Sequence, residues 1–175
     1  MVFGLLSPRA WQRRLFLLVS TGIIIVVDQL SKQWALDTLK TADNQEISIS
    51  PLLSFNLTEN TGLAFSIPIT NYLYIGLFVV ALIIIWFVAK ATMSRSKYLG
   101  PIAIGLILGG AAGNFIDRIR FGAVIDYIDF LFFPIFNLAD LAILGGVLVT
   151  LYILIKKPKK RQKVSTPKSD APEVE

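Results

Sequence analysis

Four apolar stretches, each close to the length of a transmembrane helix, constrain the fold of this chain most strongly. They cover approximately residues 15–36, 72–91, 98–116 and 136–155. A helix needs about 20 apolar residues to cross roughly 30 Å of hydrocarbon. The mean hydropathy of +0.65 and the hydrophobic content of 54% both exceed those of ordinary soluble domains. The sequence therefore predicts an all-α integral membrane protein, with one domain of four transmembrane helices over residues 1–155.

The segments outside these stretches differ from one another in composition. In residues 37–71, apolar and polar residues alternate on either side of Pro51, at 47–49 and at 55–57, as they do in half-exposed strands. This pattern predicts a small β-rich segment outside the cytoplasm. Residues 119–135 are mostly apolar but too few to cross the membrane and return, which predicts an interfacial segment or lid. Residues 156–175 are polar and contain prolines, which predicts a disordered cytoplasmic tail.

The distribution of basic residues predicts how the helices are oriented. Thirteen of the 17 Lys and Arg residues precede the first span, lie between the second and third, or follow the fourth. By the positive-inside rule, both termini and the loop between the second and third spans are predicted to be cytoplasmic. Membrane topology thus accounts for the net charge of +5, and nucleic-acid binding is not expected.

The composition excludes several kinds of catalytic and metal site. The chain contains no Cys and no His. A Ser-His-Asp triad, a Cys nucleophile, an H-E-x-x-H zinc site and a disulfide framework are therefore impossible. Hydrolysis would have to depend on carboxylates, or on a Ser paired with a Lys. We expect neither a metal ion nor a cofactor.

Polar residues gather at the predicted outer ends of the spans. An ionisable side chain in a membrane is unfavourable unless it is paired or functional. The inner halves of the spans carry essentially none, whereas a proton or ion pathway would need polar groups across the full depth. We therefore predict a site at the outer membrane boundary. Its candidate residues are Asp28, Lys32, Asn60, Asn114, Asp117, Arg118, Asp126, Asn137 and Asp140.

The stretch 124–140 contains the carboxylates best placed for catalysis, which are Asp126, Asp129 and Asp140. Two carboxylates that meet in a partly dry site share a proton, so that one can activate water while the other protonates the leaving group. This predicts aspartyl-protease chemistry, with the charge of Asp140 favoured by the start of a helix. Asn137 and Asp140 also fit a simple capping box. The residues alone do not decide between Asp126 and Asp129 as the partner of Asp140.

Five short motifs in and around this cluster carry a resemblance to a known family. They are D-Q-L-S-K at 28–32, N-T-G-L-A-F at 60–65, G-G-A-A-G-N-F-I-D-R at 109–118, V-I-D-Y-I-D-F at 124–130 and F-N-L-A-D at 136–140. In this order they resemble the bacterial lipoprotein signal peptidases (signal peptidase II), over about residues 20–150. The resemblance implies an aspartic endopeptidase that cuts the signal peptide from diacylglyceryl-modified prolipoproteins, just before the lipidated cysteine. It also implies Asp126 and Asp140 as the catalytic pair.

The resemblance has further implications for the site and its setting. The other seven candidate residues would position the substrate or support the catalytic pair. The protein would act, as a monomer, in the bacterial cytoplasmic (inner) membrane with its active site at the outer face. Its partners would be prolipoproteins, membrane lipid and globomycin-type cyclic peptide inhibitors. Leu63, Tyr127 and Leu141 depart from the residues usual in the family, and only 14 residue steps separate Asp126 from Asp140.

Three other functions are compatible with parts of the sequence. A non-enzymatic lipoprotein-binding or assembly factor could keep this fold, but both motif carboxylates are intact. A small transporter is disfavoured by the apolar inner halves of the spans. A Ser-Lys hydrolase would use Ser31 and Lys32, but neighbours on a helix point about 100° apart, which places that pair poorly.

Overall fold

The computed structural model describes residues 8–62 and 71–156, and these form four long helices and a small β-sheet. In chain order the elements are α1 (Pro8–Leu39), η2 (Asp43–Gln45), β1 (Glu46–Ser50), β2 (Leu53–Asn60), α2 (Asn71–Met93), α3 (Leu99–Phe121), β3 (Val124–Phe130) and α4 (Leu138–Ile155). Each of the four long helices contains a segment apolar enough to cross a membrane. The predicted four-helix membrane fold is therefore confirmed. The predicted tail after residue 156 and the end of the N-T-G-L-A-F motif (63–65) lie outside the described residues.

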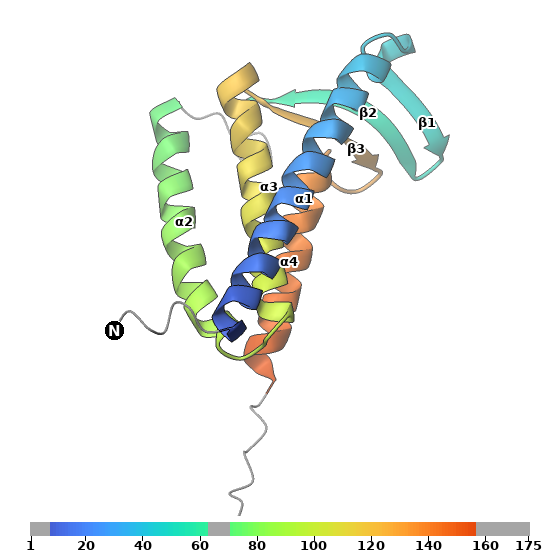
Figure 1. Ribbon diagram of the computed structural model, residues 1–175. Helices are drawn as coiled ribbons and strands as arrows, with labels where there is room; N and C mark the ends of the chain where they lie inside the picture. Colours follow the sequence, from blue (N-terminus) through green and yellow to red (C-terminus); the bar gives the residue numbers. More distant parts are fainter. Residues whose placement is uncertain (1–7, 63–70, 157–175) are drawn as a thin grey trace, which may run out of the picture.

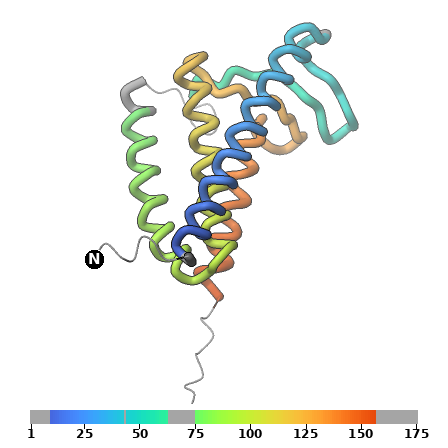
Figure 2. Tube along the Cα trace, in the orientation of Figure 1, coloured from blue at the N-terminus to red at the C-terminus, as the bar shows by residue number. Residues whose placement is uncertain are grey.

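The helices run side by side, and the sheet lies at one end of them (Figures 1 and 2). The start of α1, the α2–α3 connection and the end of α4 lie together at the opposite end. The helix α3 packs extensively on both α1 and α4, whereas α2 makes fewer contacts with the rest. The three elements that predominate in the packing, α1, α3 and α4, thus converge below the sheet.

Glycines bring the neighbouring helices close to α3. Those on the face toward α1 recur every four residues, as the sequence predicted, and are Gly105, Gly109 and Gly113. A Cβ atom at Gly109 would lie 2.7 Å from the Cβ of Ile24, and one at Gly113 would collide with the carboxylate of Asp28. On another face of α3, a Cβ at Gly110 would collide with the carbonyl oxygen of Ala139 in α4. Side chains larger than hydrogen would therefore separate α3 from its partners.

The sheet has the strand order β1-β2-β3 and is antiparallel throughout. The strands β1 and β2 lie on either side of Pro51, where alternation predicted them. The strand β3 was not predicted. It lies within the segment 119–135, which was expected to be an interfacial segment or lid. Thr58 of β2 pairs with Asp126 of β3, and an irregularity between Phe55 and Thr58 shifts the register.

A small apolar core fixes the sheet to the end of α1. Ala35 and Leu39 from the last turns of α1 are fully buried against Leu57 of β2 and Ile125 and Tyr127 of β3. The helix therefore extends past the predicted end of the first span and carries the sheet on its last turns. Burial of these side chains stabilises the position of β3 relative to the helices.

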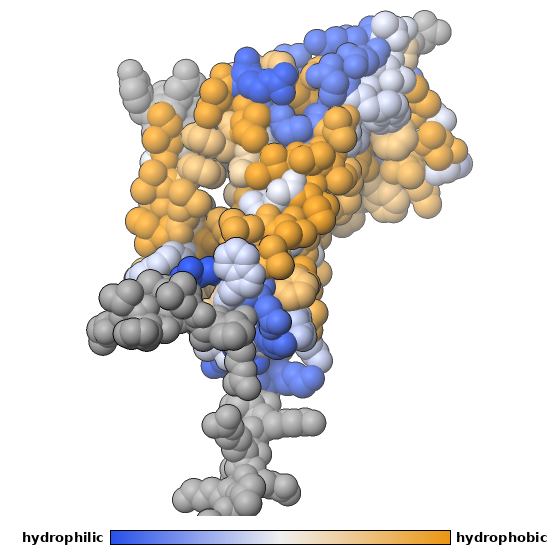
Figure 3. All heavy atoms as spheres, in the orientation of Figure 1, coloured by the Kyte–Doolittle hydropathy of each residue, from blue (hydrophilic) through white to orange (hydrophobic). Residues whose placement is uncertain are grey.

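Large apolar side chains cover the outside of the helices between two more polar ends (Figure 3). Exposed examples are Val26 and Leu30 on α1, and Ile83 and Ile84 on α2. An apolar surface of this extent is unfavourable in water and is typical of a lipid-facing surface. It agrees with the membrane spans assigned from hydropathy.

Candidate active site

A cavity of about 640 Å³ lies where the helices meet the sheet. Its polar lining comes from four elements and consists of Asn60 and Thr58 on β2, Asn114 and Arg118 on α3, Asp126 on β3, and Asp140 on α4. The rest of the wall is mostly apolar and includes Phe130, Phe133, Ile135, Leu141 and Leu144. A cavity with a polar end and an apolar wall suits a ligand that is itself part polar and part apolar.

The alternation of β3 places Asp126, and not Asp129, at this cavity. Successive side chains of a strand point to opposite faces of the sheet, so residues three apart lie on different faces. Asp126 lines the cavity, whereas Asp129 lies opposite Ser54 and its Oδ2 is 3.5 Å from the amide of Asn56. The geometry therefore brings Asp126 together with Asp140 and leaves Asp129 outside.

Asn137 joins the two carboxylates of the cavity. As the N-cap of α4, its Oδ1 accepts a 3.0 Å hydrogen bond from the backbone N–H of Asp140, and Asp140 Oδ2 accepts one of 3.3 Å from the N–H of Asn137. The predicted capping box is therefore present. The side-chain amide of Asn137 also donates to Asp126 Oδ1 at 2.6 Å. Because Asn137 is fully buried, water does not compete for its side-chain amide.

Asn114 connects the catalytic candidates to the interior of the helices. Its amide donates to Asp140 Oδ1 at 2.8 Å. Its Oδ1 accepts from Lys32 Nζ at 2.9 Å and from the amide of Asn137 at 3.1 Å. The positive charge of Lys32 beside Oδ1 polarises the amide of Asn114 and makes it a stronger hydrogen-bond donor to Asp140.

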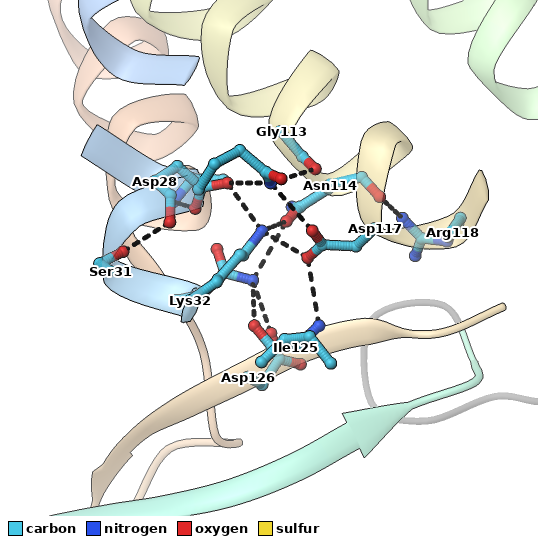
Figure 4. Close-up of polar contacts among 12 residues, drawn as sticks. Asp28, Ser31, Lys32, Gly113, Asn114, Asp117, Arg118, Ile125 and Asp126 are labelled. Carbon is cyan, nitrogen blue, oxygen red and sulfur yellow. Dashed lines mark hydrogen bonds and ion pairs between the residues drawn. The ribbon is translucent and has the colours of Figure 1, made fainter. Parts of the chain in front are cut away.

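Lys32 is held between two buried carboxylates (Figure 4). Its Nζ lies 2.8 Å from Asp28 Oδ2 and 2.7 Å from Asp117 Oδ2, and all three side chains are almost completely buried. Asp28 Oδ1 accepts from the backbone N–H of Ala139, at 3.0 Å, and Asp117 Oδ2 accepts from that of Ile125, at 3.2 Å. Asp28 thereby holds the start of α4, and Asp117 holds β3 next to Asp126.

Asn60 and Arg118 complete the polar end of the cavity. The amide of Asn60 donates to Asp126 Oδ2 at 3.0 Å, while its Oδ1 accepts from the N–H of Gly62 at 3.0 Å. The guanidinium of Arg118 donates to the carbonyl oxygens of Asn114 and Gly62, each at 3.4 Å. All nine predicted site residues therefore belong to one connected arrangement of hydrogen bonds and ion pairs.

Burial raises the pKa of Asp126 from its ordinary value of 3.8 to about 6. The hydrogen bonds from Asn60 and Asn137 oppose this rise, and the negative charge of Asp140 adds to it. A carboxyl that is buried beside a second carboxylate favours its protonated form. Asp126 is therefore suited to hold a proton at a pH at which an ordinary aspartate is ionised.

The structure argues against the Ser-Lys alternative. Ser31 Oγ donates to the carbonyl oxygen of Asp28 at 2.7 Å, and Lys32 Nζ is taken up by Asp28, Asp117 and Asn114. No Ser31–Lys32 hydrogen bond of the kind that would activate the hydroxyl is present between these two described residues. Within residues 8–62 and 71–156, no group of three or more Asp and Glu side chains is arranged to hold a metal ion.

Sequence reasoning missed Gln29. Its side-chain amide donates to Asp117 Oδ1 at 2.9 Å and lies 3.4 Å from Asp28 Oδ2. An uncharged amide at the end of a span gives little signal in a hydropathy profile. The signal that could have found it is its place inside the D-Q-L-S-K motif, next to Asp28.

Comparison with known proteins gives a consistent result over most of the chain. The family model described as "Signal peptidase (SPase) II" matches residues 20–156. A lipoprotein signal peptidase of Halothermothrix orenii is 38% identical over 133 residues, which cover 75% of this chain and 90% of the relative. A lipoprotein signal peptidase of Coxiella burnetii is 36% identical over 166 residues, which cover 89% of this chain and 96% of the relative.

Solved structures show the same architecture. A bacterial membrane enzyme determined by the in meso method at 2.3 Å resolution aligns with a TM-score of 0.67 and 28% sequence identity. The alignment covers 84% of this chain and 92% of the other. A second bacterial membrane enzyme, determined by the same method at 1.9 Å resolution, aligns with a TM-score of 0.65 and 29% identity. The agreement in fold thus extends over most of the chain.

Proposed function

The chain belongs to the signal peptidase II family, and from this membership and the meeting of Asp126 with Asp140 we propose that it is a membrane aspartic endopeptidase. The family indicates a protease that removes signal peptides from lipoproteins. Our proposal adds the chemistry and the substrate. The substrate is a diacylglyceryl-modified prolipoprotein, and the cut falls just before the lipidated cysteine.

The observation that carries the proposal is the convergence of two aspartates from different elements on one cavity. Asp126 comes from β3 and Asp140 from the first turn of α4. Asn137 contacts both, and the charge of Asp140 contributes to the raised pKa of Asp126. Such coupling makes it favourable for the pair to hold one proton, which is the state that acid–base hydrolysis of a peptide bond needs.

In the proposed mechanism, Asp140 acts as the base and Asp126 as the acid. Asp140 removes a proton from a water molecule whose oxygen attacks the carbonyl carbon of the peptide bond. Protonated Asp126 transfers its proton to the carbonyl oxygen, which becomes a hydroxyl in the tetrahedral intermediate. The C–N bond then breaks as the leaving amine takes the proton from Asp140, and one hydroxyl of the intermediate returns a proton to Asp126 as the carboxylic acid forms. The amides of Asn60, Asn114 and Asn137 hold both carboxylates in place throughout.

The shape of the cavity supports a substrate with lipid attached. Its apolar wall includes Phe130, Leu141 and Leu144, and α4 continues from there into a segment apolar enough to cross the membrane. Acyl chains or the apolar part of a signal peptide can lie along this wall while the peptide bond reaches the aspartates. We infer that globomycin-type cyclic peptides compete for the same cavity, and that the protein acts as a monomer.

The proposed orientation follows from the basic residues. Arg13 and Arg14 at the start of α1, Lys90 and Arg95 near the α2–α3 connection, and Lys156 after α4 lie at the end opposite the sheet. By the positive-inside rule this end is cytoplasmic, so both termini are cytoplasmic and the cavity opens at the outer face of the bacterial inner membrane.

A cleavage assay on two forms of one precursor tests the proposal. The detergent-purified protein is mixed with a prolipoprotein that carries diacylglyceryl on its cysteine, and separately with the unmodified precursor. We expect cleavage of the modified form alone, with a product whose mass places the lipidated cysteine at its N-terminus. Binding without cleavage would favour a non-enzymatic assembly factor, and cleavage of both forms would contradict the assigned substrate.

A further inference from the structure

Gln29 lies between two buried carboxylates of the polar cluster. Its Nε2 donates to Asp117 Oδ1 at 2.9 Å, and it lies 3.4 Å from Asp28 Oδ2 and 3.3 Å from the carbonyl oxygen of Gly113. Lys32 also contacts both carboxylates, at Oδ2 of Asp28, which it shares with Gln29, and at Oδ2 of Asp117. Asp28 and Asp117 are therefore joined twice, by the charge of Lys32 and by the amide of Gln29.

Each of these carboxylates holds one of the elements that bring an aspartate to the cavity. Asp28 accepts from the N–H of Ala139, the residue before Asp140. Asp117 accepts from the N–H of Ile125, the residue before Asp126. A change in the distance between Asp28 and Asp117 would therefore move the backbone at Ala139 and Ile125. It would thereby change the distance between the two aspartates of the cavity.

One lysine cannot satisfy this pair of carboxylates by itself. Asp28 and Asp117 place four carboxyl oxygens in a site from which water is almost excluded, and Lys32 contacts only two of them. A buried carboxylate needs donors for its remaining lone pairs. Gln29 supplies one, and its own Oε1 accepts from the guanidinium of exposed Arg120 at 3.2 Å. That contact polarises the amide toward the carboxylates and links the buried pair to a second cation.

We propose that Gln29 is a positioning residue for the reaction, which fixes the separation of Asp126 and Asp140 by joining Asp117 to Asp28. Gln29 does not line the cavity, so it acts through these carboxylates and not on the substrate. The inference rests on the proposed peptidase function. Since displacement of catalytic groups by about 1 Å can lower a rate 100-fold, a small change in this spacing is sufficient to affect kcat.

The test compares Gln29→Met with Gln33→Met in the cleavage assay. Methionine keeps the length of the side chain and removes both the donor and the acceptor. Gln33 lies one turn further along the same helix, is exposed, and donates to Asp37 Oδ1 at 2.8 Å. Its substitution is therefore a matched control, because it removes a glutamine–aspartate hydrogen bond outside the site. The value of kcat is divided by the folded fraction measured by circular dichroism at the assay temperature.

For Gln29→Met we expect kcat to fall about 10-fold or more, with KM within about two-fold of wild type. Gln33→Met should retain both constants. Arg120→Met, which alters an exposed side chain, should lower kcat about two- to three-fold, and should have no further effect when Gln29 is already Met. This non-additivity is a result that general destabilisation of the helices would not give.

A value of kcat per folded molecule within about two-fold of wild type for Gln29→Met would overturn the proposal. If that variant does not fold, Arg120→Met decides, and an unchanged kcat there would overturn it as well. A folded wild type that does not cleave would instead refute the proposed peptidase function, and the positioning role with it. The wild-type reaction therefore separates the two failures.

Discussion

Asn137 donates a 2.6 Å hydrogen bond from its side-chain amide to Oδ1 of Asp126, although the first residue begins α4 and the second lies in β3. The other end of the same side chain accepts from the N–H of Asp140. The side chain of Asn137 therefore both caps α4 and orients Asp126. Its two functions can be separated by substitutions that keep the cap and change the donor.

Asn137→Asp should preserve α4 and abolish most of the activity. The new carboxylate still accepts from the N–H of Asp140, because Asp is as good an N-cap as Asn. It no longer donates to Asp126 and adds a negative charge beside it. We expect cleavage to fall about 100-fold or more, measured as kcat/KM. Asn56→Asp, outside the cavity, is the matched control, and equal rates for the two variants would contradict the assigned contact.

The raised pKa of Asp126 predicts a pH-dependent stability. Folding raises this pKa from 3.8 to about 6, so the folded protein binds the proton more tightly than the unfolded chain does. The free energy of unfolding should therefore decrease as the pH rises from about 4 to about 6, by about 3 kcal/mol for this group, and stay lower above that range. Asp126→Asn removes the ionisation and should be more stable relative to wild type at pH 8 than at pH 4.

This prediction is measured as the difference in melting temperature between wild type and Asp126→Asn in detergent, at pH 4 and pH 8. The comparison between the two proteins cancels the titration of groups that do not interact with Asp126. Asp129→Asn, which replaces a carboxyl outside the cavity, is the matched control. A difference for Asp126→Asn that does not vary with pH would show that Asp126 is not buried as described.

Gly113→Ala should disturb the buried ion pairs without removing a polar group. A Cβ at this position would collide with the carboxylate of Asp28, whereas a Cβ at Gly145 of α4 would have no atom within 4 Å. Overpacking of this kind typically costs 1–3 kcal/mol, so about 2 kcal/mol of stability should be lost. Gly145→Ala should be neutral or slightly stabilising, since alanine favours a helix over glycine. Equal melting temperatures for the two variants would contradict the close α1–α3 contact.

Lys32→Met should destabilise the protein strongly. It leaves Asp28 and Asp117 buried without the cation that contacts both, and breaking a buried ion pair in this way costs about 3–5 kcal/mol. Lys40→Met, at an exposed position just after the end of the same helix, should change stability by less than about 0.5 kcal/mol. Chemical unfolding of both variants in detergent measures the difference. A loss below about 1 kcal/mol for Lys32→Met would imply that the carboxylates are not both ionised.

The sequence predicted most of the helical part of the fold, because hydropathy is a local property of the chain. The apolar stretches lie within α1 and α2 and overlap α3 and α4, although α1 begins earlier and ends later than the stretch 15–36. Its last turns carry Leu36 and Leu39, which pack under the sheet and not in lipid. Hydropathy cannot distinguish those two kinds of burial, so the end of the helix could not be located from it.

The strand β3 was harder to predict for two reasons. Residues Val124 to Tyr127 are all buried, so apolar and polar positions do not alternate as in a half-exposed strand. The partner of β3 is β2, which lies on the far side of two transmembrane helices in the sequence. Long-range pairing of this kind leaves no local pattern, and it is what places Asp126 and not Asp129 at the cavity.

The ionisable residues of the site could be predicted because charged side chains are unfavourable in a membrane. Gln29 was missed because its amide is neutral. Asp28, Lys32 and Asp117 stand out in apolar surroundings. Their shared membrane depth was predictable from helix length, but their partners were not. That Asp28 contacts α4 and Asp117 contacts β3 depends on how the helices pack.

The central claim is that Asp126 and Asp140 cleave the substrate, and mutation of each carboxylate tests it most directly. Wild type, Asp126→Asn, Asp140→Asn and Asp129→Asn are purified in detergent, shown to be folded, and mixed with a diacylglyceryl-modified prolipoprotein in a gel-shift assay. We predict that wild type and Asp129→Asn cleave the precursor, and that Asp126→Asn and Asp140→Asn do not. Cleavage at the full rate by either of the latter two would contradict the account.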